Sequence, residues 1–189
     1  MRPVALSDQI AVGEMPSLDE ITVLAKAGFR SLINAQPDGE LARHLSADAI
    51  ADAAARAGMT TVHIPIESRR PSEDRIQAFA SALATLPLPA YACCYSGARA
   101  AAGWALAAAP TMRVEDIVAS CTSAGYDMAF FLPELARRHA AAAVRPGPTA
   151  AQPIAAQPES STAIASWQAK SPPPDLPRPA SAGGFAVSG

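Results

Sequence analysis

A repeated alternation of helix and strand patterns constrains the fold of this chain more than any other feature. Each of three units pairs a helix pattern, preceded by a serine that can cap it, with a short apolar strand pattern. Further helix patterns follow the last strand. This order predicts an α/β fold with a mainly parallel central sheet flanked by helices. The predicted helices are 18–27, 46–57, 71–85, 99–109, 114–123 and 127–140, and the predicted strands are 29–34, 60–66 and 90–93.

The composition changes near the end of the chain. The sequence has 189 residues, 50% of them hydrophobic, which is enough for one core. From about residue 144 onward, nine of the 18 prolines occur among Ala, Ser, Gln and Gly. This composition is typical of disorder. We therefore expect a folded catalytic domain over residues 1–140 and a disordered Pro/Ala/Ser-rich tail over residues 141–189.

Charge and cysteine usage exclude several classes of function. The net charge of −2 provides no basic field for nucleic acid, and no stretch reaches the roughly 18 apolar residues of a membrane span. Three cysteines cannot form a disulfide framework, which indicates a reducing compartment, and we expect a cytoplasmic protein. The histidines and cysteines lack metal-ligand spacing, so we expect neither a metal nor another cofactor. The sequence leaves the oligomeric state open.

Candidate catalytic residues follow the end of the third predicted strand. Ligands of parallel sheets bind beyond the carboxyl ends of strands, and there Cys94 begins a loop that ends at Arg99. Backbone amides of such a loop and the following helix N-terminus form an anion-binding cradle. The Arg99 guanidinium can hold two oxygens of a tetrahedral anion, and these positive surroundings favour a reactive thiolate at Cys94. The expected anion-binding loop consists of Tyr95, Ser96, Gly97 and Ala98.

The other two cysteines are expected to belong to the core. Strand alternation points Cys93 to the face opposite Cys94, and Cys121 lies inside a helical pattern. A buried free cysteine behaves as a small hydrophobe. Ser96 could donate its hydroxyl to Cys94 or cap the loop, and both readings stay open.

Three segments together resemble a known family. They are Ser31-Leu-Ile-Asn-Ala-Gln-Pro-Asp-Gly-Glu40, Val62-His-Ile-Pro-Ile66 and Cys94-Tyr-Ser-Gly-Ala-Arg99. In this order they resemble the phosphatase-like domain of the β-lactamase-hydrolase-like proteins, over about residues 10–108. The resemblance implies a fold like that of dual-specificity phosphatases. Related domains occur fused to sulfide-oxidation enzymes, where a sulfur-transfer role has been proposed. Tyr95 and Ala98 depart from the Arg and Thr of the family's loop, which removes a positive charge and a hydroxyl.

The length of the loop separates two chemistries. Four residues lie between Cys94 and Arg99, as in rhodanese-type sulfurtransferases, whose thiolate carries a persulfide. Counting from Cys93 gives five residues, the spacing of tyrosine and dual-specificity phosphatases. Those phosphatases have a glycine three residues after the nucleophile, which Gly97 satisfies only from Cys94. The shorter loop therefore fits better.

The residues around the expected site also favour sulfur chemistry. A phosphatase needs a general acid, and Glu67 is the nearest candidate, whereas sulfur transfer needs none. Arg69 and Arg70 could steer an anionic substrate or form a solvated loop. We therefore expect a cysteine enzyme that takes a small anionic or sulfane-sulfur substrate. The alternatives are hydrolysis of a phosphorylated substrate and an inactive binding module.

Overall fold

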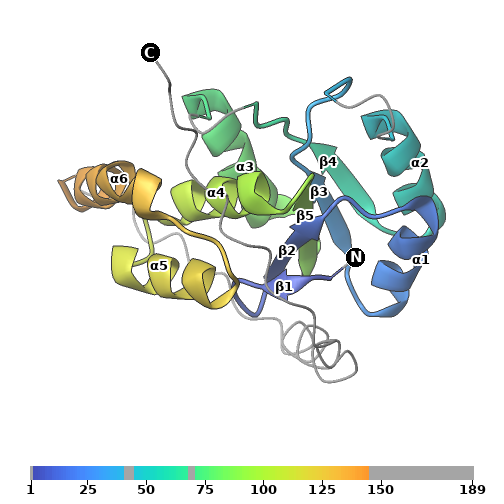
Figure 1. Ribbon diagram of the computed structural model, residues 1–189, viewed down its shortest axis with the longest axis horizontal. Helices are drawn as coiled ribbons and strands as arrows, with labels where there is room; N and C mark the ends of the chain where they lie inside the picture. Colours follow the sequence, from blue (N-terminus) through green and yellow to red (C-terminus); the bar gives the residue numbers. More distant parts are fainter. Residues whose placement is uncertain (1, 41–44, 68–70, 145–189) are drawn as a thin grey trace, which may run out of the picture.

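The computed structural model describes residues 2–40, 45–67 and 71–144, which form a sheet with helices on both faces (Figure 1). The sheet has five strands in the order β1-β2-β5-β3-β4, and all neighbours are parallel except β1 and β2. The predicted α/β fold with a mainly parallel sheet is confirmed. The strands are β1 (Val4–Ala5), β2 (Ile10–Glu14), β3 (Ser31–Asn34), β4 (Thr60–His63) and β5 (Ala90–Cys94).

Helices cover the sheet on both sides. In Figure 1, α1 and α2 lie on one side and α3 to α6 on the other. Buried apolar clusters fill the two interfaces, one around Leu32 and Tyr91 and the other around Phe79 and Trp104. Burial of these two clusters is the main source of stability. The helices are α1 (Leu18–Lys26), α2 (Ala47–Arg56), α3 (Glu73–Thr85), α4 (Ala98–Ala108), α5 (Val114–Ser123), the 3₁₀ helix η1 (Ala129–Phe131) and α6 (Leu132–Val144).

Each of the first three helices begins after a serine that caps it. The Ser17 hydroxyl accepts from the Glu20 amide at 3.3 Å, and the Glu20 carboxylate accepts from the Ser17 amide at 2.8 Å. This is the reciprocal pair of a capping box. Ser46 and Ser72 each accept from the amide three residues further on. These local signals explain why the helices start where the sequence predicts.

The structure differs from the sequence analysis in three places. Strands β1 and β2 are not predicted by the sequence patterns, because β1 has two residues and β2 is a short run without alternation, buried on both faces over its first four residues. β4 ends at His63 instead of residue 66. The helix predicted over 127–140 is divided into η1 and α6, and Pro133 lies in the first turn of α6, where its missing N–H is not needed.

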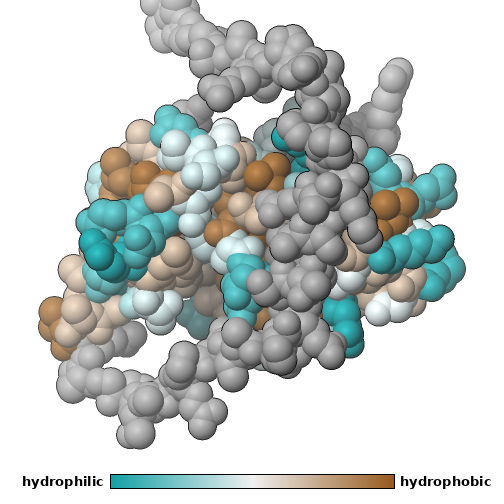
Figure 2. All heavy atoms as spheres, turned by 90° about the horizontal axis from the view of Figure 1, so that it is seen from below, coloured by the Kyte–Doolittle hydropathy of each residue, from teal (hydrophilic) through white to brown (hydrophobic). Residues whose placement is uncertain are grey.

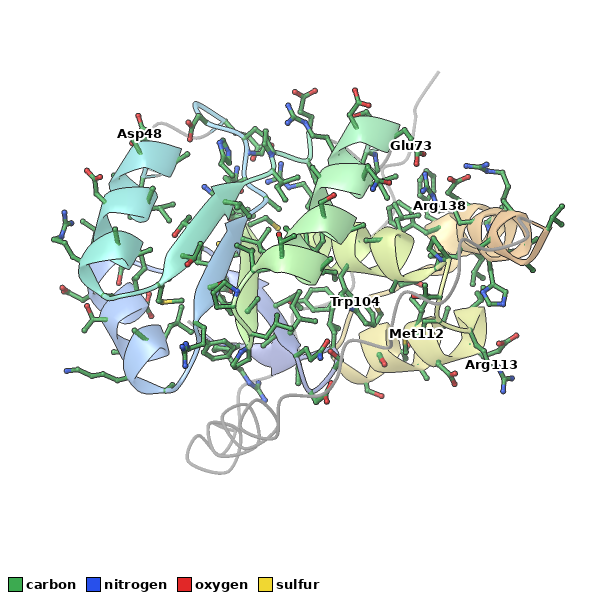
Figure 3. All side chains as sticks on the ribbon, turned by 180° about the vertical axis from the view of Figure 1, so that it is seen from behind. Asp48, Glu73, Trp104, Met112, Arg113 and Arg138 are labelled. Atoms are coloured by element: carbon green, nitrogen blue, oxygen red, sulfur yellow. The ribbon has the colours of Figure 1, made fainter. Side chains whose placement is uncertain are left out.

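Helix α6 is tied to α3 by an ion pair. The Arg138 side chain, 10% exposed, donates to Glu134 at 2.7 Å and to Glu73 at 3.1 Å. Figure 3 shows Arg138 and Glu73 side by side on α6 and α3. The hydrogen bond from Arg138 lowers the pKa of Glu73. This contact joins α6 to the rest of the fold, and the helix continues to Val144, four residues into the predicted tail. The rest of the predicted tail lies outside the described residues.

The described surface mixes polar and apolar side chains. The face in Figure 2 carries hydrophobic residues in small patches between hydrophilic ones. Large exposed apolar side chains come from separate elements, among them Val23, Tyr95 and Phe130. In the part of the chain that the structure describes, no helix has the length and apolar character needed to cross a membrane.

Gly13 in β2 has no room for a side chain. A Cβ atom there would lie 2.5 Å from the Tyr91 hydroxyl and 2.9 Å from the Arg2 carbonyl oxygen. The same hydroxyl donates to the Glu14 carbonyl at 2.6 Å. We expect Gly13→Ala to lower the free energy of unfolding by about 1–3 kcal/mol in a denaturant titration. The loss should be smaller in a Tyr91→Phe background; an equal loss would show that the hydroxyl contact is not its cause.

Candidate active site

The two cysteines at the end of β5 face opposite sides of the sheet. Cys94 is 1% exposed and lies in the cluster under α3 and α4, whereas Cys93 is fully buried in the cluster under α1 and α2. This arrangement confirms the orientation that strand alternation predicts. Cys93 Sγ lies 3.7 Å from Met15 Sδ, and burial raises the pKa of its thiol. Cys121 is also buried, and burial raises its pKa to about 12.

The chain after Cys94 turns sharply into α4. Gly97 immediately precedes the helix with φ +84°, in the left-handed region that favours glycine. The Tyr126 hydroxyl donates to the Ser96 carbonyl at 3.3 Å. A Cβ atom on Gly97 would contact the same hydroxyl. The pKa of Tyr126 is raised to about 12, first by burial and then by the neighbouring Cys94. Tyr126 thus holds the loop from outside.

Arg99 extends from the first turn of α4 to the turn after β3. Its Nη1 donates to Glu40 Oε1 at 2.8 Å, and its Nη2 donates to Glu40 Oε2 at 2.7 Å. This is the bidentate geometry by which arginine recognises carboxylates and phosphates. Nη1 also donates to the Ile66 carbonyl at 3.2 Å. The hydrogen bond with Glu40 raises the pKa of Arg99, burial opposes it, and a hydrogen bond with Cys94 adds to it. The structure therefore brings the predicted pair, Cys94 and Arg99, together.

The Gln36 side chain joins the loop to the end of β3. Gln36 is 2% exposed, and its Oε1 accepts from the Tyr95 amide at 2.7 Å and from Arg99 Nη2 at 2.8 Å. Its Nε2 donates to Glu40 Oε2. Gln36 and Glu40, named here the Gln36–Glu40 pair, together engage the Arg99 guanidinium and the first amide of the loop.

The backbone of Gln36 is held at the same time. Its amide donates to Asn34 Oδ1 at 2.9 Å, and its carbonyl accepts from His63 Nε2 at 2.7 Å. The preceding residue, Ala35, donates its amide to the Cys93 carbonyl at 2.7 Å. Contacts from β3, β4 and β5 therefore fix Gln36, and the polar groups of this buried residue have partners.

The structure places the other predicted residues around this network. Tyr95, Ser96 and Ala98 are exposed, and an anion in the loop would compete with Gln36 for the Tyr95 amide. Glu67 is exposed and directly follows Ile66, whose carbonyl Arg99 contacts. The catalytic, anion-binding and acid roles stay predictions. Arg69 and Arg70 lie outside the described residues.

Sequence analysis does not identify the parts played by Gln36, Glu40 and Tyr126. The first two follow β3, and the rule that ligands bind beyond strand ends could have directed attention to them. Tyr126 lies between α5 and η1, and no local pattern connects it to the loop. Among residues 2–40, 45–67 and 71–144, no group of three or more His, Cys, Asp or Glu side chains is placed to hold a metal ion.

Two pockets flank the loop and could receive parts of a substrate. One of about 680 Å³ adjoins Tyr95 and Ser96 on the side of β2 and α1. The other, of about 380 Å³, adjoins Arg99 and includes Tyr126 and Phe130. Cys94 itself lines neither pocket and is almost completely buried.

Gly97 provides a test of how tightly the loop is packed. A Cβ atom at Gly97 would approach the Tyr126 hydroxyl to 2.2 Å and Gly13 Cα to 3.0 Å, and its φ is unfavourable for alanine. We expect Gly97→Ala to reduce the free energy of unfolding by about 1–3 kcal/mol in a denaturant titration. Gly125→Ala is the matched control, because Gly125 has φ +87° and nothing within 4 Å of its Cβ position. Equal losses in the two variants would argue against the packing constraint.

Comparison with known proteins agrees with this arrangement. The family model for the phosphatase-like domain of the β-lactamase hydrolase-like protein matches residues 3–111. The β-lactamase hydrolase-like protein of Xylella fastidiosa (strain 9a5c) is 34% identical over 130 residues, which is 68% of this chain and 30% of that protein. Its namesake in Agrobacterium fabrum (strain C58) is 30% identical over 143 residues, 75% of this chain and 33% of that protein. The chain spans about a third of the length of these curated relatives.

Solved structures show the same fold. A candidate phosphatase from Neisseria meningitidis has a TM-score of 0.64 at 21% identity, covering 71% of this chain and 96% of that chain. PTPMT1 in complex with PI(5)P has a TM-score of 0.61 at 13% identity, covering 77% of this chain and 99% of that chain. The expected phosphatase-like fold is confirmed. With the family match over residues 3–111, these findings show that the chain belongs to the family of phosphatase-like domains found in β-lactamase hydrolase-like proteins.

Proposed function

We propose that this chain is a thiol enzyme in which Cys94 carries sulfur as a persulfide. The observation that carries the proposal is the pairing of Glu40 with Arg99 at the mouth of the Cys94 loop. A carboxylate beside a guanidinium is favoured in its ionised form. Glu40 can then accept hydrogen bonds but cannot supply the proton that the leaving oxygen of a phosphate ester needs.

Sulfur transfer needs fewer catalytic groups than hydrolysis of a phosphate ester, because it requires no general acid. The Cys94 thiolate attacks the outer sulfur of a donor R–S–SH, the donor S–S bond breaks, and RSH leaves with the proton. The product is Cys94–S–S⁻, which passes its outer sulfur to an acceptor thiolate in a second exchange of the same kind. The N-terminus of α4 and the Arg99 guanidinium stabilise negative charge on the cysteine sulfur before and after transfer.

Hydrolysis of a phosphomonoester is the second candidate, and the fold shared with phosphatases favours it. In this reaction Cys94 would attack phosphorus and Glu67 would protonate the leaving oxygen. Glu67 is the acidic residue nearest along the chain to the Ile66 carbonyl that Arg99 contacts. This reaction would also require an incoming phosphate to replace the Glu40 carboxylate on Arg99.

Intact-mass spectrometry after brief incubation with thiosulfate or glutathione persulfide tests the first proposal. With at least one of these donors we expect a gain of about 32 mass units that maps to Cys94, the mass of one added sulfur. Cys94→Ser should abolish the adduct because it removes the attacking thiolate. Cys93→Ser is the matched control and should keep the adduct, since Cys93 faces the opposite core.

Turnover of an aryl phosphate separates the alternatives. Turnover that depends on Cys94, without any sulfur adduct, would replace sulfur transfer with phosphatase activity. A large loss of that turnover in Glu67→Gln would then identify Glu67 as the general acid. No reaction with either class of compound would indicate a binding module.

A further inference from the structure

The arginine that ends the Cys94 loop already holds an anion supplied by the protein. The two carboxylate oxygens of Glu40 take the two Nη atoms of Arg99, as two oxygens of a bound phosphate would. Gln36 adds to this by accepting from the Tyr95 amide. Both Nη atoms of Arg99 and the Tyr95 amide are thus engaged by the Gln36–Glu40 pair.

The negative charge of Glu40 affects any ligand that approaches Cys94. The Glu40 side chain is 39% exposed and that of Arg99 is 19% exposed, so solvent screens their charges only partly. A compact dianion would have to displace the carboxylate from Arg99 and would still lie close to it. A donor whose sulfane sulfur carries little charge avoids both costs.

We propose that Glu40 is a specificity-determining residue that selects against compact dianions and in favour of sulfane sulfur carried on an organic thiol. This inference rests on the proposed sulfur transfer and names the class of donor. Phosphate, sulfate and thiosulfate belong to the disfavoured class, because each places concentrated negative charge at the position of the Glu40 carboxylate. Gln36 is a positioning residue that orients Glu40 through its Nε2 and Arg99 through its Oε1.

The decisive variant is Glu40→Gln. Glutamine keeps an oxygen that can accept from Arg99 but removes the charge. We expect the dissociation constant for inorganic sulfate, measured by isothermal titration calorimetry, to fall by at least about tenfold. A role for Glu40 in merely holding Arg99 in place predicts weaker sulfate binding instead, so that outcome would overturn the proposal.

Asp38→Asn is the matched control. Asp38 lies in the same turn, and its Oδ1 accepts from the Ala47 amide at 2.8 Å, a bond that asparagine can keep. This variant removes the same charge without altering the Arg99 contacts. We expect its sulfate affinity to stay within about twofold of the wild type. If Asp38→Asn increased sulfate affinity as much as Glu40→Gln, the effect would come from the net charge of the protein, which would contradict the proposal.

The rates of persulfide formation test the choice of donor. We expect Glu40→Gln to increase the rate with thiosulfate, relative to the rate with glutathione persulfide, by about tenfold. Normal persulfide formation with an unchanged rate ratio and unchanged sulfate affinity would overturn the role of Glu40 and leave the sulfur chemistry intact. Absence of any Cys94 persulfide, in wild type and variant, would overturn the sulfur chemistry itself.

Discussion

The position of β5 between β2 and β3 is the constraint on which the rest of the site depends. Parallel pairing aligns Glu14 of β2 with Cys94, and Asn34 of β3 with Cys93. The carboxyl ends of the three strands therefore lie at one edge of the sheet, where parallel sheets bind their ligands. The Ala35 amide extends this pairing past the end of β3 by donating to the Cys93 carbonyl.

Burial of the Gln36 amide gives this edge a defined arrangement. An unpaired amide group in such a position would cost about 1–3 kcal/mol, so its bonds to Tyr95, Arg99 and Glu40 favour a single geometry. His63 and Asn34 hold its backbone in the same way. The loop after Cys94, Arg99 and the turn after β3 are therefore joined in one polar network.

A fold shared with phosphatases does not decide the chemistry, because function depends on the side chains placed at the site. What the solved phosphatases share with this chain is the overall fold. At its site, this chain has four residues between Cys94 and Arg99 and a carboxylate paired with that arginine. Both are the observations on which the proposed sulfur transfer rests.

Much of this fold could be predicted from local patterns. Serine caps and helical periodicity located the three helices that precede strands, and alternation along β5 separated Cys93 from Cys94. Such signals act between residues close in the chain, so the sequence alone is sufficient to read them. The sequence does not predict β2, because burial on both faces removes the alternation that marks a strand.

The loop from Cys94 to Arg99 was likewise evident from the sequence, since cysteine, glycine and arginine lie within six residues. The partners of Arg99 and of the loop's first amide were decided by tertiary structure. Gln36 and Glu40 are separated from Arg99 by about sixty residues, and parallel pairing of β3 with β5 brings them together. Tyr126 reaches Gly97 in the same way, from beyond α5. Contacts of this kind depend on strand order, which no local pattern encodes.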